Sequence, residues 1–486
     1  MLIYAVLAVP LAAGMAAAVL PWWRLAGWAA AAANGAVLVL GIALAAEATH
    51  RRLPVVAGGV LRADALSAFM VVVIGAIAFL ASVQSVRYLG AETGRGACTA
   101  RHAVLYTTLI QAFVSCMLLA VLAANLGVTW VAVEATTIAT TFLVGHRRTD
   151  GALEASWKYL VICSVGIALA FLGTVLVYFA ALHAGGHAAG SLDWTSLMAG
   201  ARRLNPGVVR LAMGLLVLGY GTKAGLAPMH SWLPDAHSQA PAPVSALMSG
   251  VLLTVAFYAL LRFKAIADGA LGPGYPRALL VVAGLASLGV AASLLLTQKD
   301  YKRMLAYHSI EHMGLIALGA AAGSSLAIAA VLLHILGHGL AKGVLFLASG
   351  EILLAEGTSE IEKVPALLSR RPVLGGIFGF GLVALLGLPP FSLFVSELNM
   401  VRAEFTAGLG WAAAIALVCM AVIFAAVMAH GRHLLLGEAA PQGQREAAPR
   451  IVAVPLITGL LACAFLGVSA WPLEPLLHAA ARVVAS

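Results

Sequence analysis

A glutamate and a lysine interrupt two separate apolar stretches of this chain. Glu134 lies in the apolar run 125–145, and Lys223 lies in the run 208–226, just before a segment rich in proline. A charged side chain at the centre of a bilayer costs roughly 2.5–3.5 kcal/mol on insertion scales, so it is normally found where it has a partner or a function inside a protein. The two residues therefore predict a buried site that holds and moves charge.

The two charges are predicted to act on each other. At about 4 Å and an effective dielectric constant near 20, opposite unit charges attract by roughly 4 kcal/mol. The position of Glu134 would then decide how readily Lys223 gives up a proton. The alternative interpretation is a static ion pair that only stabilises the bundle. Lys158, at the start of another apolar run, is expected near Glu134, either as a relay or as an anchor at the membrane edge.

Three more titratable residues share one helical spacing. His334, His338 and Lys342 follow one another at intervals of four residues, which drifts only about 40° per step on an α-helix. They would form one stripe roughly 12 Å long. Imidazole both donates and accepts protons, so the stripe predicts a proton path. Histidines satisfied inside a packed core are the alternative interpretation.

Further titratable residues flank this path. His308, with Glu311 and His312 close to it in the sequence, is expected either to give access to the path or to belong to a cluster at the membrane surface. Glu397 follows a pair of prolines and would end the path towards the opposite face of the membrane. These residues extend the predicted proton path beyond the three-residue stripe.

The elements that position these residues are predicted to be membrane helices. Of the 486 residues, 62% are hydrophobic and only 10% are charged, whereas soluble proteins carry about 25% charged residues; the mean hydropathy is +0.99. A spanning helix needs about 20 apolar residues. The predicted fold is an all-α polytopic membrane protein with about fourteen helices, near residues 2–23, 25–46, 64–85, 103–123, 125–145, 158–182, 208–228, 243–263, 277–297, 304–322, 326–350, 373–395, 409–431 and 451–471.

Proline interrupts two of the predicted helices at comparable depth. Helix 7 breaks at Pro228 and continues through Pro234 and Asp235, and helix 12 breaks at Pro389 and Pro390. Proline removes a backbone donor, and backbone groups freed at membrane depth have to be buried in protein or line a water-filled cavity. Asp235 is expected to hold the broken segment together. Paired breaks five helices apart are typical of inverted repeats; two unrelated kinks are the alternative.

These breaks divide the chain into four predicted regions. Helices 1–3 occupy residues 1–100, and a first repeat of helices 4–8 occupies residues 101–265. A second repeat of helices 9–13 occupies residues 275–433, and helix 14 with a short tail occupies residues 434–486.

Basic residues predict how the chain is oriented. With the N-terminus outside, the connections after odd-numbered helices hold about 16 Lys and Arg, and those after even-numbered helices about 10. The positive-inside rule therefore places both termini in the periplasm of a bacterium, with the chain in the inner membrane and the lipid bilayer as its surroundings. Arg262 and Lys264, at the end of helix 8, are expected to be anchors that extend to the membrane surface.

Signals for other chemistries are weak. The five cysteines are scattered without a C-x-x-C spacing, which argues against a metal or disulfide role. The glycine-rich string 376–381 lies inside a membrane run and follows no strand, so it does not predict a dinucleotide site. We expect no cofactor, no metal, no nucleic acid partner and no catalytic motif. A haem held by paired histidines is the alternative, but it would leave Lys342 without a purpose.

Five motifs resemble those of the antiporter-like, proton-translocating subunits shared by complex I, Mrp-type cation/proton antiporters and membrane-bound hydrogenases. The resemblance covers roughly residues 60–430. Within that group the chain looks most like component F of hydrogenase-4 and formate hydrogenlyase-type complexes, through residues 133–145 and 155–168. The motifs that carry the wider resemblance are Val133–Ala135, Trp157–Tyr159, Lys223–His237, Gln298–Ser309 and His334–Lys342.

The resemblance implies a fold of fourteen helices with two inverted five-helix repeats. It implies Glu134 and Lys223 as a coupling pair, Lys342 as the central proton carrier and Glu397 as the distal site. It also implies other membrane and peripheral subunits, including a hydrogenase or dehydrogenase arm, that supply the redox chemistry. The chain departs from many relatives at Thr254, where they place Lys or His inside helix 8. Water or His308 would then bridge the path.

Two other functions fit the same residues. The first is a secondary transporter driven by the proton gradient, as a cation/proton antiporter component or as the membrane subunit of a bicarbonate-uptake complex. The second is a membrane scaffold that moves no ions. A proton wire works in both directions, so residue types alone do not separate a pump from a transporter.

Overall fold

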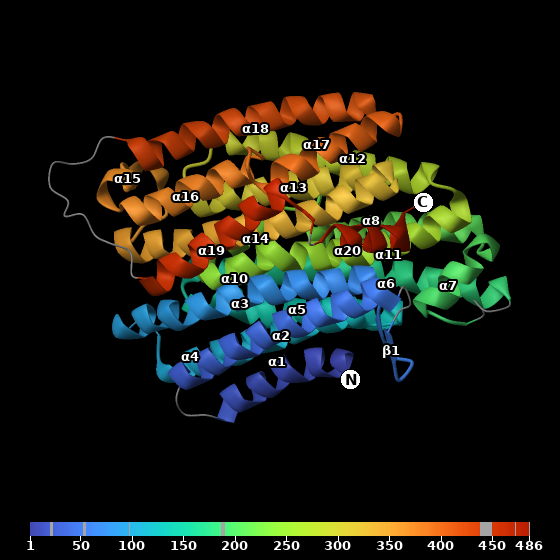
Figure 1. Cartoon of the computed structure of the whole chain (residues 1–486), viewed down its shortest axis with the longest axis horizontal. Coiled ribbons are helices and arrows are strands. Elements are labelled where there is room, and N and C mark those ends of the chain that lie inside the picture. The colour runs from blue at the N-terminus through green and yellow to red at the C-terminus, as the bar shows by residue number, and fades with distance from the viewer. Residues whose placement is uncertain are drawn as a thin grey trace.

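Long helices lie side by side through the whole molecule, and the chain crosses the bundle from α1 on one flank to α18 on the other (Figure 1). The structure is a computed structural model that describes residues 1–19, 23–51, 55–96, 98–185, 190–437, 450–471 and 473–485. One short antiparallel hairpin, β1 (Val55–Ala57) and β2 (Leu61–Ala63), precedes the third helix.

The helices of the first half are α1 (Leu2–Val19), α2 (Trp23–Arg51), α3 (Ala65–Gly94), α4 (Ala100–Leu122), α5 (Leu126–Val144), α6 (Asp150–Ala184), α7 (Trp194–Gly200), α8 (Pro206–Ala224), α9 (Trp232–Gln239), α10 (Ala242–Leu247) and α11 (Leu253–Leu271). Those of the second half are α12 (Gly274–Leu295), α13 (Tyr301–Ala322), α14 (Ser325–Glu356), α15 (Leu367–Arg370), α16 (Pro372–Leu385), α17 (Ser392–Thr406), α18 (Gly410–Leu436), α19 (Arg450–Val468) and α20 (Glu474–Val484). Short 3₁₀ helices are η1 (Gly145–Arg147), η3 (Ala201–Arg203) and η5 (Ile361–Lys363), and the π-helical stretch η4 (Met248–Leu252) joins α10 to α11.

Side chains placed directly before the helices explain where several of them begin. Thr99, Asn125 and Thr149 each accept a hydrogen bond from a backbone N–H in the first turn of α4, α5 and α6. Such caps satisfy donors that a helix leaves free at its N-terminus. The starts of these three helices are therefore set by local sequence.

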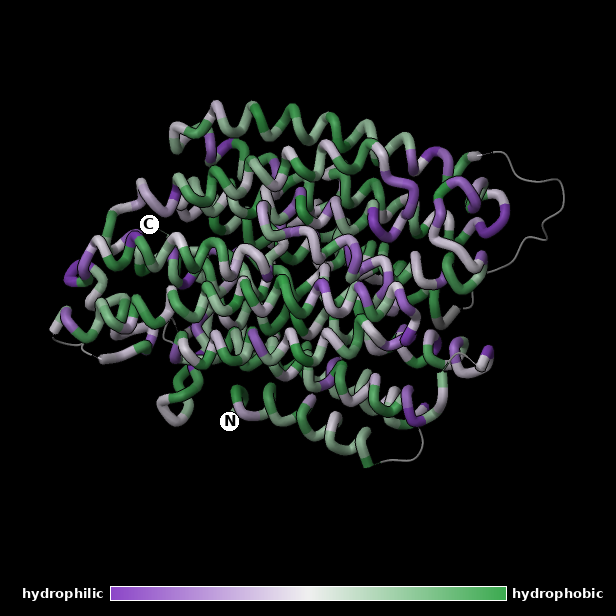
Figure 2. Tube along the Cα trace, turned by 180° about the vertical axis from the view of Figure 1, so that it is seen from behind, coloured by the Kyte–Doolittle hydropathy of each residue, from purple (hydrophilic) through white to green (hydrophobic). Residues whose placement is uncertain are grey.

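Hydrophobic residues run along the helices, and hydrophilic ones gather mainly near the helix ends, with a minority inside the bundle (Figure 2). Within the described residues, 10 helices are long and apolar enough to cross a membrane, and two shorter apolar helices accompany them. The predicted class, an all-α multi-pass membrane protein, is confirmed. The count of fourteen spans stays a prediction.

The chain leaves helical structure at both predicted break positions, and the two breaks close in the same way. Gly225 and Gly387 have φ angles of +79° and +63°, which glycine adopts without steric cost. The next residue, Leu226 or Leu388, donates its N–H to a carbonyl five residues earlier, as in a Schellman motif. Both breaks also contain a cis X–Pro bond, before Pro228 and before Pro390. The depth of these breaks in a membrane, and the division into two repeats, stay predictions.

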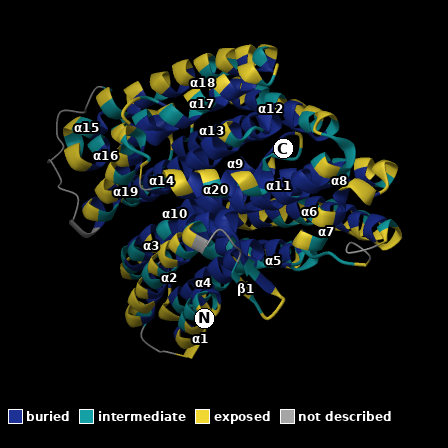
Figure 3. Cartoon of the chain, turned by 45° about the vertical axis from the view of Figure 1, so that its right-hand side comes forward, coloured by how far each residue is buried: buried dark blue, intermediate teal, exposed yellow. Residues whose placement is uncertain are grey.

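The helix α14 forms the axis of the bundle. Its residues from Ala327 to Gly350 are all buried, and it contacts α3, α10, α13, α16, α17, α19 and α20. Figure 3 shows the buried centre against exposed residues on outer helices such as α1, α2 and α18. Side chains on α14 are thus surrounded by protein.

Two buried ion pairs correct one prediction from the sequence. Arg262 and Lys264 are 3% and 2% exposed, so they are not surface anchors. Arg262 pairs with Asp64 at 2.7 Å, and Lys264 pairs with Asp268 at 2.6 Å. The prediction used only the position of these residues near a helix end, and Asp64 is supplied by the N-cap of α3, far away in the sequence.

The region after α18 is described only in part. Residues 438–449, which belong to the predicted fourth region (residues 434–486), lie outside the described residues. The tail after α19 forms the helix α20, which packs on α3 and α14.

Candidate functional site

Lys223 lies at the end of α8 in a polar cluster contributed by α5 and α6. It is fully buried, and its Nζ donates to Thr137 Oγ1 at 2.9 Å and to Tyr159 Oη at 2.6 Å. Tyr159 Oη in turn lies 2.5 Å from Thr140 Oγ1. Two hydroxyl groups therefore accept hydrogen bonds from the lysine, and a third, on Thr140, bonds one of them; a buried ammonium requires such partners.

Close packing of α6 on α8 holds this cluster together. A Cβ at Gly219 would lie 2.6 Å from the Gly166 carbonyl and would also overlap the Ala170 backbone. The two helices therefore meet at backbone distance one turn before Lys223. This approach brings Tyr159, on α6, within reach of the lysine.

Glu134 belongs to the same cluster without touching Lys223. Thr137 Oγ1 donates to Glu134 Oε2 at 3.1 Å, and Ser164 Oγ donates to Glu134 Oε1 at 3.3 Å. Among the described residues no direct ion pair joins Glu134 to Lys223. The predicted pair is thus brought together through a threonine, which sequence reasoning missed, because a threonine in an apolar run carries no signal of its own.

Lys158 pairs with carboxylates other than Glu134. Its Nζ is 2.6 Å from Glu154 and 3.2 Å from Asp235, and Arg303 reaches the same aspartate at 2.6 Å. The Lys158 side chain is 48% exposed. The contacts of Asp235 tie α9 to α6 and α13, which agrees with its predicted structural role, and they favour the anchor interpretation of Lys158.

Side chains near the α8 break form hydrogen bonds with backbone groups of this segment. Trp232 Nε1 donates to the Thr222 carbonyl at 2.9 Å, and the Ala227 N–H donates to Ser287 Oγ, also at 2.9 Å. Pro234 lies in the first turn of α9 and is buried. Polar groups freed by the break are therefore paired inside the protein.

A second cluster joins α13, α14 and α17. His312 Nδ1 lies 2.9 Å from His334 Nε2, and His334 Nδ1 lies 3.0 Å from Ser396 Oγ. His308 stacks on His312 with ring centroids 4.8 Å apart, and His338 lies 5.0 Å from His312. The predicted stripe on α14 thus meets a parallel set of histidines on α13.

Three titratable residues of α13 are enclosed by protein. His308, Glu311 and His312 are at most 4% exposed, and whether they lie along the path or at the level of the membrane surface stays a prediction. His308 Nδ1 lies 2.9 Å from Glu311 Oε2. Neither ring nitrogen of His338 has a hydrogen-bond partner within the described residues, which leaves it free to exchange a proton with water or with a neighbouring ring.

Lys342 lies at the end of the stripe and is fully buried. Its Nζ donates to the carbonyl of Leu305, on α13. On the side of the first cluster, the buried His237 stacks on Phe346 at 4.9 Å and lies within electrostatic reach of Lys342 and Lys302. His237 therefore lies near Lys342 and Lys302, on a helix that packs on α5, α6 and α13.

Other polar groups lie in the same central region. Ser249 Oγ and Ser309 Oγ are 2.8 Å apart, and the Thr254 hydroxyl donates to the Val251 carbonyl at 2.9 Å. Lys302 is buried and donates to the Ser238 and Ala240 carbonyls at 2.9 and 2.8 Å. Its burial was not foreseen, because Lys302 stands beside a charged segment in the sequence. Thr254 thus lies in the central region, and its hydroxyl group donates its proton to a carbonyl of the same helical segment.

Glu397 lies where the second cluster opens to the outside. Glu311, Gly387 and Glu397 line a pocket of about 580 Å³ between α13, α16, α17 and α18. The carboxylate of Glu397 lies so close to Gly387 that a Cβ there would overlap it. The chain turns back at Pro389 and Pro390, which brings the Glu397 carboxylate beside Gly387. Glu397 therefore lies next to His312 and His334 and also lines the pocket.

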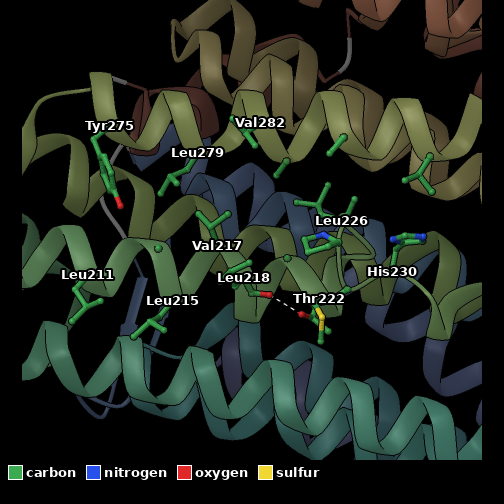
Figure 4. A pocket seen from close by; sticks show the side chains of 18 of the residues that line it. Leu211, Leu215, Val217, Leu218, Thr222, Leu226, His230, Tyr275, Leu279 and Val282 are labelled. Carbon is green, nitrogen blue, oxygen red and sulfur yellow. Dashed lines mark hydrogen bonds between the residues drawn. The ribbon is translucent and has the colours of Figure 1, made fainter.

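A second groove, of about 620 Å³, runs between α8 and α12 beside the α8 break. Figure 4 shows apolar side chains along its length, with Thr222, Leu226 and His230 near one end; the dashed line joins the Thr222 hydroxyl to the Leu218 carbonyl. Lys223 is not among its lining residues.

Two trios of side chains have the chemical types of metal ligands. The ligand atoms of His308, Glu311 and His312, and those of His312, His334 and Glu397, lie within 4.8 Å of one another. His312 and His334 already share a hydrogen bond. The same atoms can pass protons to one another without any ion.

Comparisons with known proteins place these features in context. The family model described as NADH:quinone oxidoreductase/Mrp antiporter, TM, matches residues 123–424. The hydrogenase-4 component F homolog of Methylacidiphilum infernorum is 39% identical over 348 residues, covering 72% of this chain and 73% of that protein. Hydrogenase-4 component B of Escherichia coli is 32% identical over 69% of this chain, which spans half of its length. A chain of the membrane-bound sulfane sulfur reductase, an archaeal respiratory membrane complex, has the same fold, with a TM-score of 0.89, 24% identity and coverage of 99% and 97%.

Proposed function

Because the chain belongs to the NADH:quinone oxidoreductase/Mrp antiporter transmembrane family, we propose that it conducts protons across the membrane as a subunit of a larger redox-driven complex. The family predicted from the motifs is confirmed. The observation that carries the proposal is the pair of polar clusters inside an apolar bundle, one around Lys223 and one around His312 and Lys342. Charged groups in such surroundings are retained where they move ions.

The first step takes place at Glu134 and Lys223. When the Glu134 carboxylate stays near, it favours the protonated lysine; when it moves away, the lysine loses that stabilisation and releases its proton. Thr137 transmits the change, because it bonds both side chains. The two charges are joined through one oxygen by hydrogen bonds of 2.9 and 3.1 Å, and at about 6 Å and an effective dielectric constant near 20 they attract by roughly 3 kcal/mol. A change of this size shifts the proton affinity of the lysine by roughly two pK units.

The proton then crosses the centre of the bundle. Thr254 cannot carry a charge there, so water together with His237 and His308 bridges the gap to Lys342. From Lys342 the proton passes through His338, His312 and His334, and Glu397 delivers it to the pocket that it lines. Imidazole rings at centroid distances near 5 Å need only small rotations to exchange protons directly or through one water.

A neighbouring subunit is expected against α5. Glu134 is only half-buried, and on the same face Val131 and Ile138 are 55% and 56% exposed. A carboxylate on such an apolar flank would face lipid, which costs free energy. A membrane subunit therefore covers Glu134, and motion of that subunit displaces the carboxylate. Peripheral partners of the hydrogenase or dehydrogenase type supply the redox chemistry, in line with the hydrogenase-4 names of two relatives.

The proposed location is the inner membrane of a bacterium, with both termini in the periplasm. Helices α3 and α5 end, and α4 and α6 begin, at one end of the bundle. That end carries Arg95, Arg101, Arg147 and Arg148. Under the positive-inside rule this end faces the cytoplasm.

The experiment is purification of the native complex through a tag on this chain, identification of its subunits, and reconstitution into vesicles with a pH-sensitive dye. Co-purified redox subunits and substrate-driven proton uptake that is lost in Lys223→Ala and Lys342→Ala would support the proposal. Lys363→Ala is the control, because Lys363 is 62% exposed. A complex without redox subunits that exchanges cations or takes up bicarbonate would contradict the redox-driven function. Unchanged proton uptake in both variants would refute the path.

A further inference from the structure

A groove opens between α4 and α6 at the end of the bundle where α5 stops. Both helices pack on α5, and its last turn forms the floor of a pocket of about 540 Å³. Leu105 and Leu109 line it from α4, and Leu153, Trp157 and Leu160 line it from α6. The walls are thus apolar, and Trp157 is 65% exposed.

The rim of this groove is basic. His102, His146 and Arg148 belong to its lining, and Arg101 is the exposed residue that precedes His102. Of the carboxylates nearby, Glu92 is engaged by Arg147 at 3.1 Å and Glu154 by Lys158 at 2.6 Å. Asp150, two residues after Arg148, forms no ion pair with Arg101 or Arg148 within the described part of the chain. The rim therefore carries two arginines whose charge no ion pair among the described residues neutralises.

We propose that this groove binds an anionic phospholipid, with the phosphate of its headgroup at Arg101, His102 and Arg148 and an acyl chain between α4 and α6. A basic rim over an apolar slot matches such a lipid in both charge and polarity. A zwitterionic lipid fits less well, because its ammonium group would face the same arginines.

The dimensions agree with a lipid of a single leaflet. Leu109 lies eight residues beyond Arg101 on α4, which corresponds to about 12 Å along the helix axis. Half of the hydrocarbon core of a bilayer is about 15 Å thick. Trp157 lies one helical turn after Leu153, and tryptophan side chains are frequent at the boundary between lipid headgroups and hydrocarbon.

The position of the groove connects the lipid to α5. Thr141 lines the groove, and its hydroxyl donates to the carbonyl of Thr137 at 2.7 Å. A bound lipid would brace the last turns of the helix that carries the Glu134–Thr137 contact. The lipid site itself stands on the charge and shape of the groove and does not depend on proton transport.

The test uses the full-length protein in nanodiscs of phosphatidylcholine that contain brominated lipid. Bromine quenches a nearby indole, and subtracting Trp157→Phe isolates the signal of Trp157. We expect brominated phosphatidylglycerol to quench Trp157 more strongly than brominated phosphatidylcholine. In the double variant Arg101→Gln/Arg148→Gln, the apparent affinity for phosphatidylglycerol should fall about thirtyfold.

The matched control is Arg202→Gln/Arg203→Gln, which removes two exposed arginines at the opposite end of the bundle and should leave the preference unchanged. Thermal unfolding of each variant establishes that it is folded. Equal quenching by both lipids, or a preference that survives in Arg101→Gln/Arg148→Gln, would overturn the proposal. So would a Trp157 that no lipid quenches in the native complex, because a neighbouring subunit would then fill the groove.

Discussion

Lys223 and Glu134 are linked by a single hydroxyl group, which accepts a hydrogen bond from the lysine and donates one to the carboxylate. Thr137 lies one helical turn after Glu134 on α5, so the two side chains move together with that helix. A displacement of α5 relative to α8 therefore breaks the Lys223–Thr137 bond and moves the Glu134 carboxylate away from the lysine in one step, while the Thr137–Glu134 bond within α5 is kept.

Replacement of Thr137 by valine should uncouple the two charges. Valine has nearly the same shape and no hydroxyl, so Lys223 keeps its contact with Tyr159 and loses its link to Glu134. We expect proton uptake by the reconstituted complex to fall at least about tenfold, the effect of roughly 1.4 kcal/mol. Thr107→Val is the control, because the buried Thr107 hydroxyl, on α4, donates to the backbone carbonyl of Ala103. Equal activity of the two variants would exclude a role for the bridge.

Replacement of His334 by asparagine should interrupt the second cluster. His334 uses both ring nitrogens, one towards His312 and one towards Ser396, and asparagine cannot pass a proton between them. Proton uptake should be lost while the complex still assembles, as judged by its subunit composition. His183→Asn, at an exposed site on α6, should behave like the unaltered protein. Normal uptake in His334→Asn would remove this residue from the path.

Replacement of Gly219 by leucine should destabilise the packing of α6 on α8. The new side chain would overlap Ala170 and Gly166, and overpacking typically costs about 1–3 kcal/mol. A lower thermal unfolding temperature in detergent is the expected result. Gly289→Leu is the matched control, since a Cβ at Gly289, within α12, meets nothing nearby. Equal unfolding temperatures would mean that the helices can separate without cost.

Replacement of Asp64 by asparagine should be costly at neutral pH, because it leaves Arg262 buried without its partner. Breaking a buried ion pair costs about 3–5 kcal/mol. Thermal unfolding in detergent at pH 7 measures the loss. Glu362→Gln, at an exposed site, should change stability by no more than about 0.5 kcal/mol.

The same ion pair predicts a pH dependence. Burial raises the pKa of Asp64, but the Arg262 guanidinium and the Ser67 N–H lower it more, so it lies below its usual value. The native state then binds fewer protons than the unfolded chain, and the stabilisation is complete above about pH 4. It should be lost as the pH falls through the native pKa, and Asp64→Asn should abolish that part of the dependence. An unchanged pH profile in the variant would contradict this assignment.

The sequence predicted those parts of the site that rest on charge in an apolar context. Lys223, Glu134 and the stripe from His334 to Lys342 were found because a membrane helix rarely retains a charge or an imidazole that has no function. The breaks at Pro228 and Pro390 were found because proline and glycine act locally on the backbone.

Contacts between distant segments could not be predicted in the same way. Thr137 is one of several threonines in its run, and only the approach of α8 selects it. Arg262 was misassigned because its partner, Asp64, is separated from it by most of the first half of the chain. Lys158 was expected near Glu134, but its ion pairs are with the carboxylates of Glu154 and Asp235.

The enclosure of α14 from Ala327 to Gly350 has a consequence for how the protein is made. The helices α16, α17, α19 and α20, which cover one side of α14, are synthesised after it. When α14 enters the bilayer, its stripe with Lys342 is shielded only by earlier helices such as α3, α10 and α13. A lysine at the bilayer centre costs roughly 2.5–3.5 kcal/mol during insertion, so the first half of the chain serves α14 as an intramolecular chaperone during biogenesis.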